Sequence, residues 1–317
     1  MIMSLPPAIF LMGPTASGKT NVAVELVQKL PVELISVDSA LVYQGMDIGT
    51  AKPDTATLTL APHYLVDIIK PTEVYSAAAF RRDALRLMRE ITERGNIPLL
   101  VGGTMLYFNA LQHGLSTLPE ADRDVRAELD ELIMQYGTPY LHQQLKAVDA
   151  DTAARLAPND TQRIQRAMEV YRLTGRPMSA LLKEKIPSSL PYRILPIALL
   201  PVERSQLHAR IAKRFASMLR QGLVDELRTL QACYALHAGL PSMRCVGYRQ
   251  AWKFLAGEID EAGLLNTGLA ATRQLAKRQM TWLRSMPGNI QLDCLDEKIG
   301  NYVLNKVVEH IIPKTSE

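Results

Sequence analysis

The chain has 317 residues, 47% of them hydrophobic, and a formal net charge of +4 at pH 7. These values fit a globular protein with a sizeable core, and the mild positive charge permits an acidic partner such as nucleic acid without requiring one. The three cysteines lie far apart without a C-x-x-C pair, which argues against a disulfide framework or a zinc site. No apolar stretch is long enough for a membrane span and the N-terminus lacks a signal peptide's basic region, so we expect a cytoplasmic protein with no membrane partner.

The first motif along the chain is GPTASGKT, which matches the phosphate-loop pattern G-x-x-x-x-G-K-[ST]. An apolar run before it predicts a buried strand, and Val22, Leu26 and Leu30 after it have the spacing of a helix. Backbone N–H groups, the helix N-terminus and the lysine bind phosphates in such a loop, for which ATP is the default ligand. The predicted phosphate-binding residues are Gly13, Pro14, Thr15, Ala16, Ser17, Gly18, Lys19 and Thr20. The hydroxyl of Thr20 suits a Mg²⁺ cofactor as a ligand.

Strand and helix patterns alternate through the first part of the chain. Residues 32–37 predict a second buried strand, residues 77–95 a long helix and residues 97–103 a third strand. This alternation indicates an α/β fold, with a parallel sheet flanked by helices as in the P-loop NTPases. Ligands of such sheets bind at the carboxyl ends of the strands, where Asp38 and Thr104 fall.

From residue 119 to residue 187 the pattern is helical without strands. Two amphipathic segments, at 123–137 and 159–175, carry apolar side chains at helical spacing. We therefore predict an inserted all-helical domain over 119–187, between the two parts of the phosphate-binding core at 1–118 and 188–317. A fourth buried strand is expected at 192–200, and the remainder of the chain is expected to be helical.

Three basic segments occupy the second half, at residues 161–166, 244–249 and 272–284. Each segment alone is typical of a solvated helix face. Between Glu261 and Asp293, however, the sequence holds no acidic residue at all. The three segments together therefore favour a surface that binds the phosphodiester backbone of a nucleic acid.

The last of these segments has its cations on one side of a helix. At about 100° per residue, Arg273, Lys277 and Arg284 form one stripe. Tyr248 and Trp282 lie within the basic segments and are candidates for stacking on unpaired bases.

Two other functions are compatible with parts of this pattern. A typical P-loop ATPase has a second apolar strand ending in an acidic residue, whereas residues 97–104 end in Gly-Gly-Thr. Small-molecule and nucleotide kinases tolerate that arrangement, so an ATP-dependent kinase stays open, although it does not explain the basic segments. A non-catalytic RNA-binding P-loop protein also stays open, although it has no use for Asp38.

The order of the motifs adds a further indication. GPTASGKT, ISVDSALVYQGMDIGTAKP, YSAAAFRRDA, LVGGTMLY, NDTQRIQRAMEVYRLTG, RCVGYRQ and KRQMTWLR follow one another between Gly13 and Arg284. In these motifs the sequence resembles bacterial tRNA dimethylallyltransferases, also called tRNA isopentenyltransferases. Eukaryotic members often carry a C-terminal zinc finger, for which this sequence has no Cys/His set. The resemblance implies that a dimethylallyl group passes from dimethylallyl diphosphate to N6 of adenosine 37, next to the tRNA anticodon, with release of diphosphate.

The chemistry of this transfer and the resemblance suggest four catalytic residues. The adenine amine must lose a proton as it attacks, and Asp38 is the candidate general base, with a role near Mg²⁺ as the alternative. Lys19 can stabilise the charge of the leaving diphosphate. The resemblance places Thr104 in a channel where adenine and donor meet, and Arg214 on the diphosphate.

The resemblance also implies contacts with the tRNA anticodon stem-loop from several segments. The predicted residues are Asp38, Ser39, Ala40, Leu41, Thr104, Arg126, Gln162, Arg163, Ile164, Gln165, Arg166, Arg244, Cys245, Val246, Gly247, Tyr248, Arg249, Lys277, Arg278, Gln279, Met280, Thr281, Trp282, Leu283 and Arg284. An adenine stacked in the loop must flip out to reach a buried donor. We expect the inserted domain to close over the anticodon stem and the protein to act as a monomer.

Overall fold

The computed structural model describes residues 5–116, 118–184 and 189–311. The chain forms two compact units. The sheet unit combines Met1–Leu111 with Leu190–Glu317, and the helical unit is Gln112–Ser189. Neither unit contains, in the parts that the structure describes, a helix with the length and apolar character needed to cross a bilayer.

The sheet unit is built on six parallel strands in the order β3-β2-β4-β1-β5-β6. Their bounds are β1 (Pro7–Met12), β2 (Val32–Val37), β3 (His63–Tyr64), β4 (Ile97–Gly102), β5 (Arg193–Leu200) and β6 (Ile290–Asp293). The predicted parallel α/β fold is therefore confirmed. The expectation of helix alone after residue 200 is wrong, because β6 pairs with β5 at the sheet edge. Strand β6 is short and only half-buried, so its sequence lacks a long apolar run.

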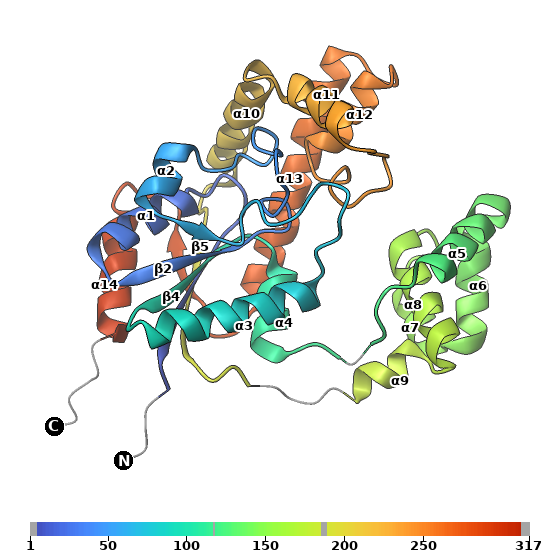
Figure 1. The fold of residues 1–317 in the computed structure, drawn as a ribbon, viewed down its shortest axis with the longest axis horizontal. Helices are drawn as coiled ribbons and strands as arrows, with labels where there is room; N and C mark the ends of the chain where they lie inside the picture. The colour runs from blue at the N-terminus through green and yellow to red at the C-terminus, as the bar shows by residue number, and fades with distance from the viewer. Residues whose placement is uncertain (1–4, 117, 185–188, 312–317) are drawn as a thin grey trace. The chain divides into compact units, whose positions relative to one another are not determined.

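Nine helices of the sheet unit are described, and most of them pack on the two faces of the sheet (Figure 1). They are α1 (Lys19–Lys29), α2 (Thr55–Leu60), α3 (Ala77–Glu93), α4 (Met105–His113), α10 (Arg204–Arg220), α11 (Leu223–Cys233), α12 (Tyr248–Leu255), α13 (Glu261–Ser285) and α14 (Ile299–Ile311). Helices α1 and α14 cover one face, and α3, α4, α10 and α13 cover the other. The carboxyl ends of β1, β2 and β4 then open beside α10 and α13.

The core follows from the alternation of side chains along each strand. In β1, Ile9 and Leu11 pack with α1 and α14, whereas Phe10 and Met12 pack with α3 and α4. Buried on both faces, the central strands need apolar side chains at every position, as parallel sheets usually do. This explains why the four longest strands are visible as continuous apolar runs in the sequence.

A third apolar cluster holds the segment that follows β2, residues 38–54, which we call the site loop. Val42, Tyr43 and Met46 of this loop are buried against α10, α11, α12 and α13. The four helices thereby fix the site loop at the carboxyl edge of the sheet.

The helical unit has its own core. It comprises α5 (Arg123–Tyr136), α6 (Thr138–Val148), α7 (Ala150–Arg155), α8 (Thr161–Thr174) and α9 (Met178–Lys183). Leu129, Leu141 and Leu145 are fully buried in its centre. The side chains of Asp122 and Asp160 accept N–H bonds at the starts of α5 and α8 and so cap these helices.

Candidate active site

The phosphate loop connects β1 to the start of α1. Gly18 and Ala16 have positive φ values of 86° and 64°, which bends the backbone into a concave turn. Helix α1 begins at Lys19 without a side-chain cap, so its first N–H groups and its positive dipole end stay available to an anion. The buried Ser17 hydroxyl has no hydrogen-bond partner among the described residues. The loop therefore has the geometry and the unused donors of a phosphate site.

Lys19 supplies the charge of this site. Its ammonium donates a hydrogen bond to the Pro14 carbonyl at 2.9 Å, which holds the side chain back over the loop. Burial lowers the pKa of Lys19 to about 8, with Arg214 acting in the same direction and Asp38 opposing it. A bound diphosphate would favour the charged form, so this lysine suits an anion with several negative charges.

Asp38 and Thr104 lie at the ends of the adjacent strands β2 and β4. One oxygen of Asp38, Oδ1, accepts the N–H groups of Ala40 at 2.8 Å and Leu41 at 3.4 Å. No partner of Oδ2 is found within the described parts of the chain, which leaves that oxygen able to accept a proton. The Thr104 hydroxyl accepts the Ser39 N–H at 3.0 Å and so ties the two strand ends together.

Arg214, on α10, contacts the site loop. Its guanidinium donates to the Thr50 carbonyl at 3.3 Å. Burial lowers the pKa of Arg214, and the charge of Asp38 opposes this shift. The side chain thus brings a second, half-buried cation to the cavity that Lys19 lines.

The site loop is held in place by Glu226 of α11. Its carboxylate accepts three consecutive backbone N–H groups, from Asp47 at 3.0 Å, Ile48 at 2.7 Å and Gly49 at 3.3 Å. The buried Tyr248 hydroxyl donates to the same carboxylate. A side chain at Gly49 would overlap the Tyr248 ring, so the close approach requires glycine there. The sequence pattern did not point to Glu226.

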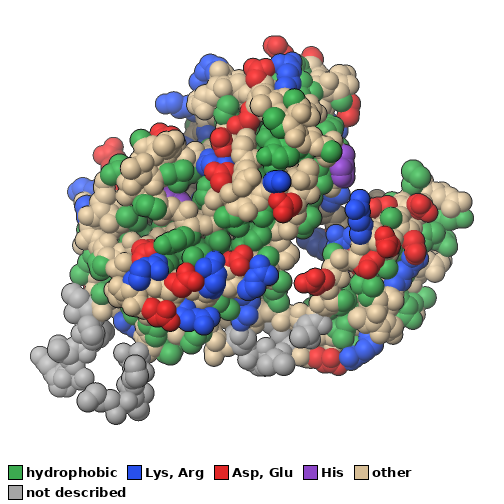
Figure 2. Space-filling view, viewed as in Figure 1, with side chains coloured by type: hydrophobic (Ala, Val, Ile, Leu, Met, Phe, Trp, Pro, Cys, Tyr) green, Lys and Arg blue, Asp and Glu red, His purple; other side chains and the backbone are tan. Residues whose placement is uncertain are grey.

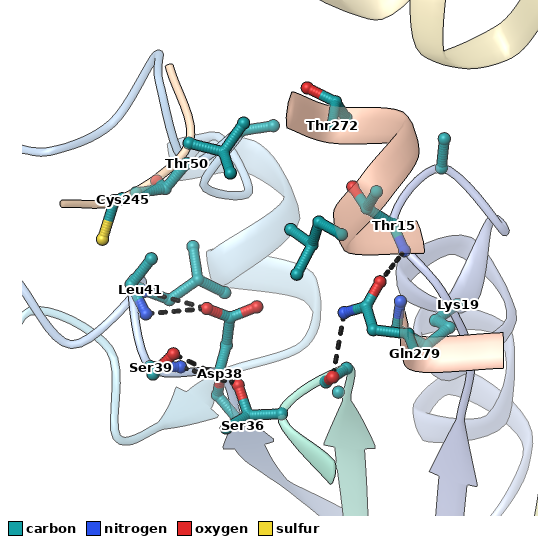
Figure 3. Close-up of a pocket in the computed structure, with 18 of the residues that line it drawn as sticks. Thr15, Lys19, Ser36, Asp38, Ser39, Leu41, Thr50, Cys245, Thr272 and Gln279 are labelled. Atoms are coloured by element: carbon teal, nitrogen blue, oxygen red, sulfur yellow. Dashed lines mark hydrogen bonds between the residues drawn. The ribbon is translucent and has the colours of Figure 1, made fainter. Parts of the chain in front are cut away.

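Gln279, on α13, joins the phosphate loop to the end of β4 (Figure 3). Its carbonyl oxygen Oε1 accepts the Thr15 N–H at 2.9 Å, and its amide nitrogen Nε2 donates to the Gly103 carbonyl at 2.9 Å. A Cβ at Gly103 would overlap this amide, which explains the glycine directly after β4. Gln279 was predicted as a tRNA contact, whereas its amide hydrogen bonds here go to the protein.

These groups surround one cavity of about 600 Å³ at the carboxyl edge of the sheet. Figure 3 shows two side chains that enter this cavity, Asp38 from the end of β2 and Lys19 from the phosphate loop. The predicted site residues that line it are Thr15, Ala16, Lys19, Thr20, Asp38, Ser39, Ala40, Leu41, Thr104, Arg214, Arg244, Cys245, Val246, Arg278, Gln279 and Trp282. The cavity is also lined by residues that were not predicted from the sequence, among them Thr50 and the α10 side chains Ile211, Phe215 and Met218.

The cationic stripe on α13 is exposed. Arg273, Lys277 and Arg284 point to solvent, as does the neighbouring Arg278. None of these four has an ion-pair partner in the portion of the chain that the structure describes. The face of α3 visible in Figure 2 differs, because its cations are interspersed with acids such as Glu90, which pairs with Arg86. The α13 stripe therefore keeps its charge available for phosphates.

Four of the predicted tRNA contacts need correction. The side chains of Ile164, Tyr248 and Leu283 are fully buried, and that of Met280 is 3% exposed. They cannot reach an external nucleic acid in this structure, because they fill the apolar cores beneath their segments. Trp282, which is 38% exposed, stays available for stacking.

The predicted cations of the helical unit already have acidic partners. Arg126 and Arg166 bind the buried Glu169 at 2.8 Å and 2.7 Å, and Arg163 pairs with Asp160. Burial alone would raise the pKa of Glu169, but hydrogen bonds from Arg126 and Arg166 hold it below its usual range. Contact of these arginines with a phosphate would therefore share or replace an existing ion pair.

The fold and the cavity define a parallel α/β protein with a phosphate-binding loop after β1 and a general-base candidate after β2, on the two sides of β4. The chain belongs to the IPP transferase family, whose model matches residues 41–286. It is 61% identical to the tRNA dimethylallyltransferase of Methylobacillus flagellatus, over 94% of this chain and 95% of the relative. The resemblance found in the motifs is thereby confirmed.

Solved structures that are similar to nearly the whole chain include the following two. The tRNA isopentenylpyrophosphate transferase of Bacillus halodurans is 36% identical, with a TM-score of 0.69, over 96% of this chain and 97% of that one. A eukaryotic dimethylallyltransferase acting on tRNA is 24% identical, with a TM-score of 0.80, over 98% of this chain and 81% of that one. The second likeness supports the fold alone.

Proposed function

We propose that this protein transfers a dimethylallyl group from dimethylallyl diphosphate to N6 of the adenosine at position 37, beside the anticodon of tRNA. The observation that carries the proposal is the single cavity in which the phosphate loop, Asp38 and Thr104 meet. The name of the relative from Methylobacillus flagellatus supports the same reaction and not a kinase.

The donor's diphosphate occupies the phosphate loop in this proposal. The loop N–H groups, Lys19 and Arg214 surround the position where negative charge grows as the allylic C–O bond breaks. The apolar side chains of α10, Ile211, Phe215 and Met218, offer a surface for the dimethylallyl group. Burial raises the pKa of the Cys245 thiol to about 12, with Asp38 acting in the same direction, so this thiol stays neutral and nucleophilically weak beside the electrophile.

The proposal includes a Mg²⁺ ion held jointly by the protein and the donor's phosphates. The described residues contain no cluster of three His, Cys, Asp or Glu side chains that could cage a metal ion. Mg²⁺ commonly takes one or two protein oxygens and completes its shell with phosphate oxygens and water. The exposed Thr20 hydroxyl, at the start of α1 and on the cavity wall, is the protein ligand that we propose. When bound, the ion would neutralise charge on the leaving diphosphate.

The acceptor adenine approaches from the strand ends. Its N6 forms a bond to the allylic carbon as the bond from that carbon to the diphosphate oxygen breaks. The surplus proton on N6 passes to Oδ2 of Asp38, whose other oxygen is fixed by two N–H groups. Thr104, whose hydroxyl accepts the Ser39 N–H, is proposed to orient the adenine.

The tRNA backbone meets exposed cations around the cavity mouth. Arg244 and Arg278 line the cavity, and Lys277 and Arg284 extend the charge along α13. Contacts with the bases of the anticodon loop would supply sequence specificity, and Trp282 would stack on one of these bases. The helical unit is proposed to hold the anticodon stem, and the protein is proposed to act as a cytoplasmic monomer.

One experiment separates the proposed function from its rivals. The protein is incubated with tRNA and dimethylallyl diphosphate labelled in the prenyl group, and the nucleosides of the digested tRNA are separated. We expect the label in nucleoside 37, on N6. Phosphoryl transfer from ATP without any prenyl label in tRNA would support the kinase instead, and tRNA binding without turnover would support the RNA-binding protein.

The pKa of Lys19 predicts how donor affinity depends on pH. Below about pH 8 the lysine is charged before binding, whereas above that pH the complex must take up a proton. The affinity for an unreactive thio-analogue of dimethylallyl diphosphate is therefore expected to fall as the pH rises through about 8. Calorimetric titration from pH 7 to 9.5 measures it, with Lys19→Arg as the control that stays charged. Equal profiles for the two proteins would contradict the prediction.

The exposed cations of α13 predict a salt effect on RNA binding. Lys277→Ala and Arg284→Ala are each expected to weaken binding of an anticodon stem-loop, because counterion release from phosphates contributes much of the affinity. The slope of log affinity against log salt should decrease by about one unit per lost phosphate contact. Filter binding at several salt concentrations measures the slope, and an unchanged slope in both variants would place the residues outside the interface.

A further inference from the structure

Gln279 differs in its contacts from the cations beside it on α13. Both ends of its amide bind backbone groups that lie far away in the sequence, the Thr15 N–H in the phosphate loop and the Gly103 carbonyl after β4. Arg278 and Lys277, its neighbours on the same helix, are exposed and make no such bond to the described chain. Gln279 thus links α13 directly to the phosphate loop and to the residue that follows β4.

The link acts on a part of the loop that needs support. The Thr15 N–H donates to the side chain of Gln279 and is not free for a phosphate. The Gln279 side chain therefore helps to set the shape of the loop. The next residue, Ala16, has a φ of 64°, in the left-handed region that non-glycine residues adopt only when their surroundings hold them there. Loss of the Gln279 bond removes one constraint on that turn.

Gln279 itself lies on α13, the helix that carries the exposed cations. Met280 and Leu283 bury one side of α13 in the core, so the helix forms a stiff connection between its exposed face and the Gln279 amide. A small shift of α13 on contact with RNA would move the acceptor of the Thr15 N–H. Conversely, a shift of the phosphate loop on phosphate binding would move the Thr15 N–H and so change its hydrogen bond to Gln279 on α13.

We propose that Gln279 is a positioning residue that couples the occupancy of the RNA surface on α13 to donor affinity in the phosphate loop. This inference rests on the proposed function, since it takes the α13 surface as part of the tRNA site. Coupling between two binding sites is reciprocal, so RNA should change donor affinity by the same factor by which donor changes RNA affinity.

The test measures that factor directly. The dissociation constant of the unreactive thio-analogue of dimethylallyl diphosphate is determined with and without a saturating anticodon stem-loop. For the unaltered protein we expect the RNA to change it by at least about fivefold, the lower end of typical coupling. Gln279→Met keeps the size of the side chain without the amide, and we expect the change to shrink to within about twofold.

Two further variants make the result specific. Gln274→Met alters an exposed glutamine on the same helix and should leave the factor as in the unaltered protein. Gly103→Ala, whose Cβ would overlap the Gln279 amide, should reduce the factor from the opposite end of the link. Circular dichroism confirms that each variant is folded, and Gln279→Glu, which keeps the acceptor for Thr15, provides a milder variant with an expected intermediate factor.

The outcomes separate this inference from the proposed function. Full coupling in both Gln279→Met and Gly103→Ala, or no coupling in the unaltered protein, would overturn the positioning role even if labelled tRNA is formed. A protein that binds no stem-loop and prenylates no tRNA would instead overturn the proposed function itself.

Discussion

Asp38→Asn is expected to slow the chemical step by about 10²- to 10⁴-fold, the range for loss of a positioned general base. The asparagine keeps the shape of the side chain and an oxygen for the Ala40 and Leu41 N–H groups, but it cannot take the proton from N6. Donor affinity should persist, since Lys19 and Thr20 are unchanged. Single-turnover rates with saturating tRNA and donor measure the effect.

A role for Asp38 near Mg²⁺ predicts a different result. Donor affinity would then fall together with the rate, and a high Mg²⁺ concentration would restore part of both. Repeating the single-turnover series at several Mg²⁺ concentrations distinguishes the roles, and restoration by Mg²⁺ would falsify the general-base assignment. Ser39→Ala serves as a control on the same loop, because its hydroxyl is not needed to take up the proton.

Glu226→Ala is expected to destabilise the sheet unit by about 3 kcal/mol, because several backbone N–H groups and the buried Tyr248 hydroxyl lose their acceptor at once. The site loop would lose its attachment to α11, so donor affinity should fall as well. Urea unfolding measures the stability, and analogue binding measures the effect on the site.

The matched control for this variant lies one residue earlier in α11. Asp225 is exposed and pairs with the exposed Arg228 at 2.6 Å, so Asp225→Ala should change stability little. Glu226→Gln keeps one acceptor oxygen and should lie between the two. If Glu226→Ala and Asp225→Ala unfold at the same urea concentration, the proposed role of Glu226 in holding the loop is wrong.

Several parts of the site could be predicted because their signals are local. The phosphate loop needs particular residues at fixed spacing, so Lys19 and Thr20 are visible in eight letters of sequence. Asp38 and Thr104 follow apolar runs that had to be parallel strands, and the rule that ligands bind at carboxyl ends placed them together. The structure brings both into the cavity with Lys19.

Other parts depend on contacts between distant segments. The backbone partners of Gln279 and Glu226 lie more than a hundred residues away, and neither side chain stands in a pattern that predicts its role. Tyr248 stands between two exposed arginines in the sequence, yet its ring is buried against Gly49. An aromatic side chain among cations is compatible with base stacking or with a core position, and only the tertiary packing decides between them.

The strand order of the sheet also has a consequence for how the chain folds during synthesis. Central strand β1 pairs with β4 on one side and with β5 on the other, and Ile9 lies opposite both Leu99 and Leu195. The helical unit is synthesised between these two partners. At about 5–20 residues per second, one edge of the nascent sheet therefore stays unpaired for several seconds. We expect early folding of the helical unit to shorten the loop that β5 must close, and chaperone binding to the open β1 edge during this interval.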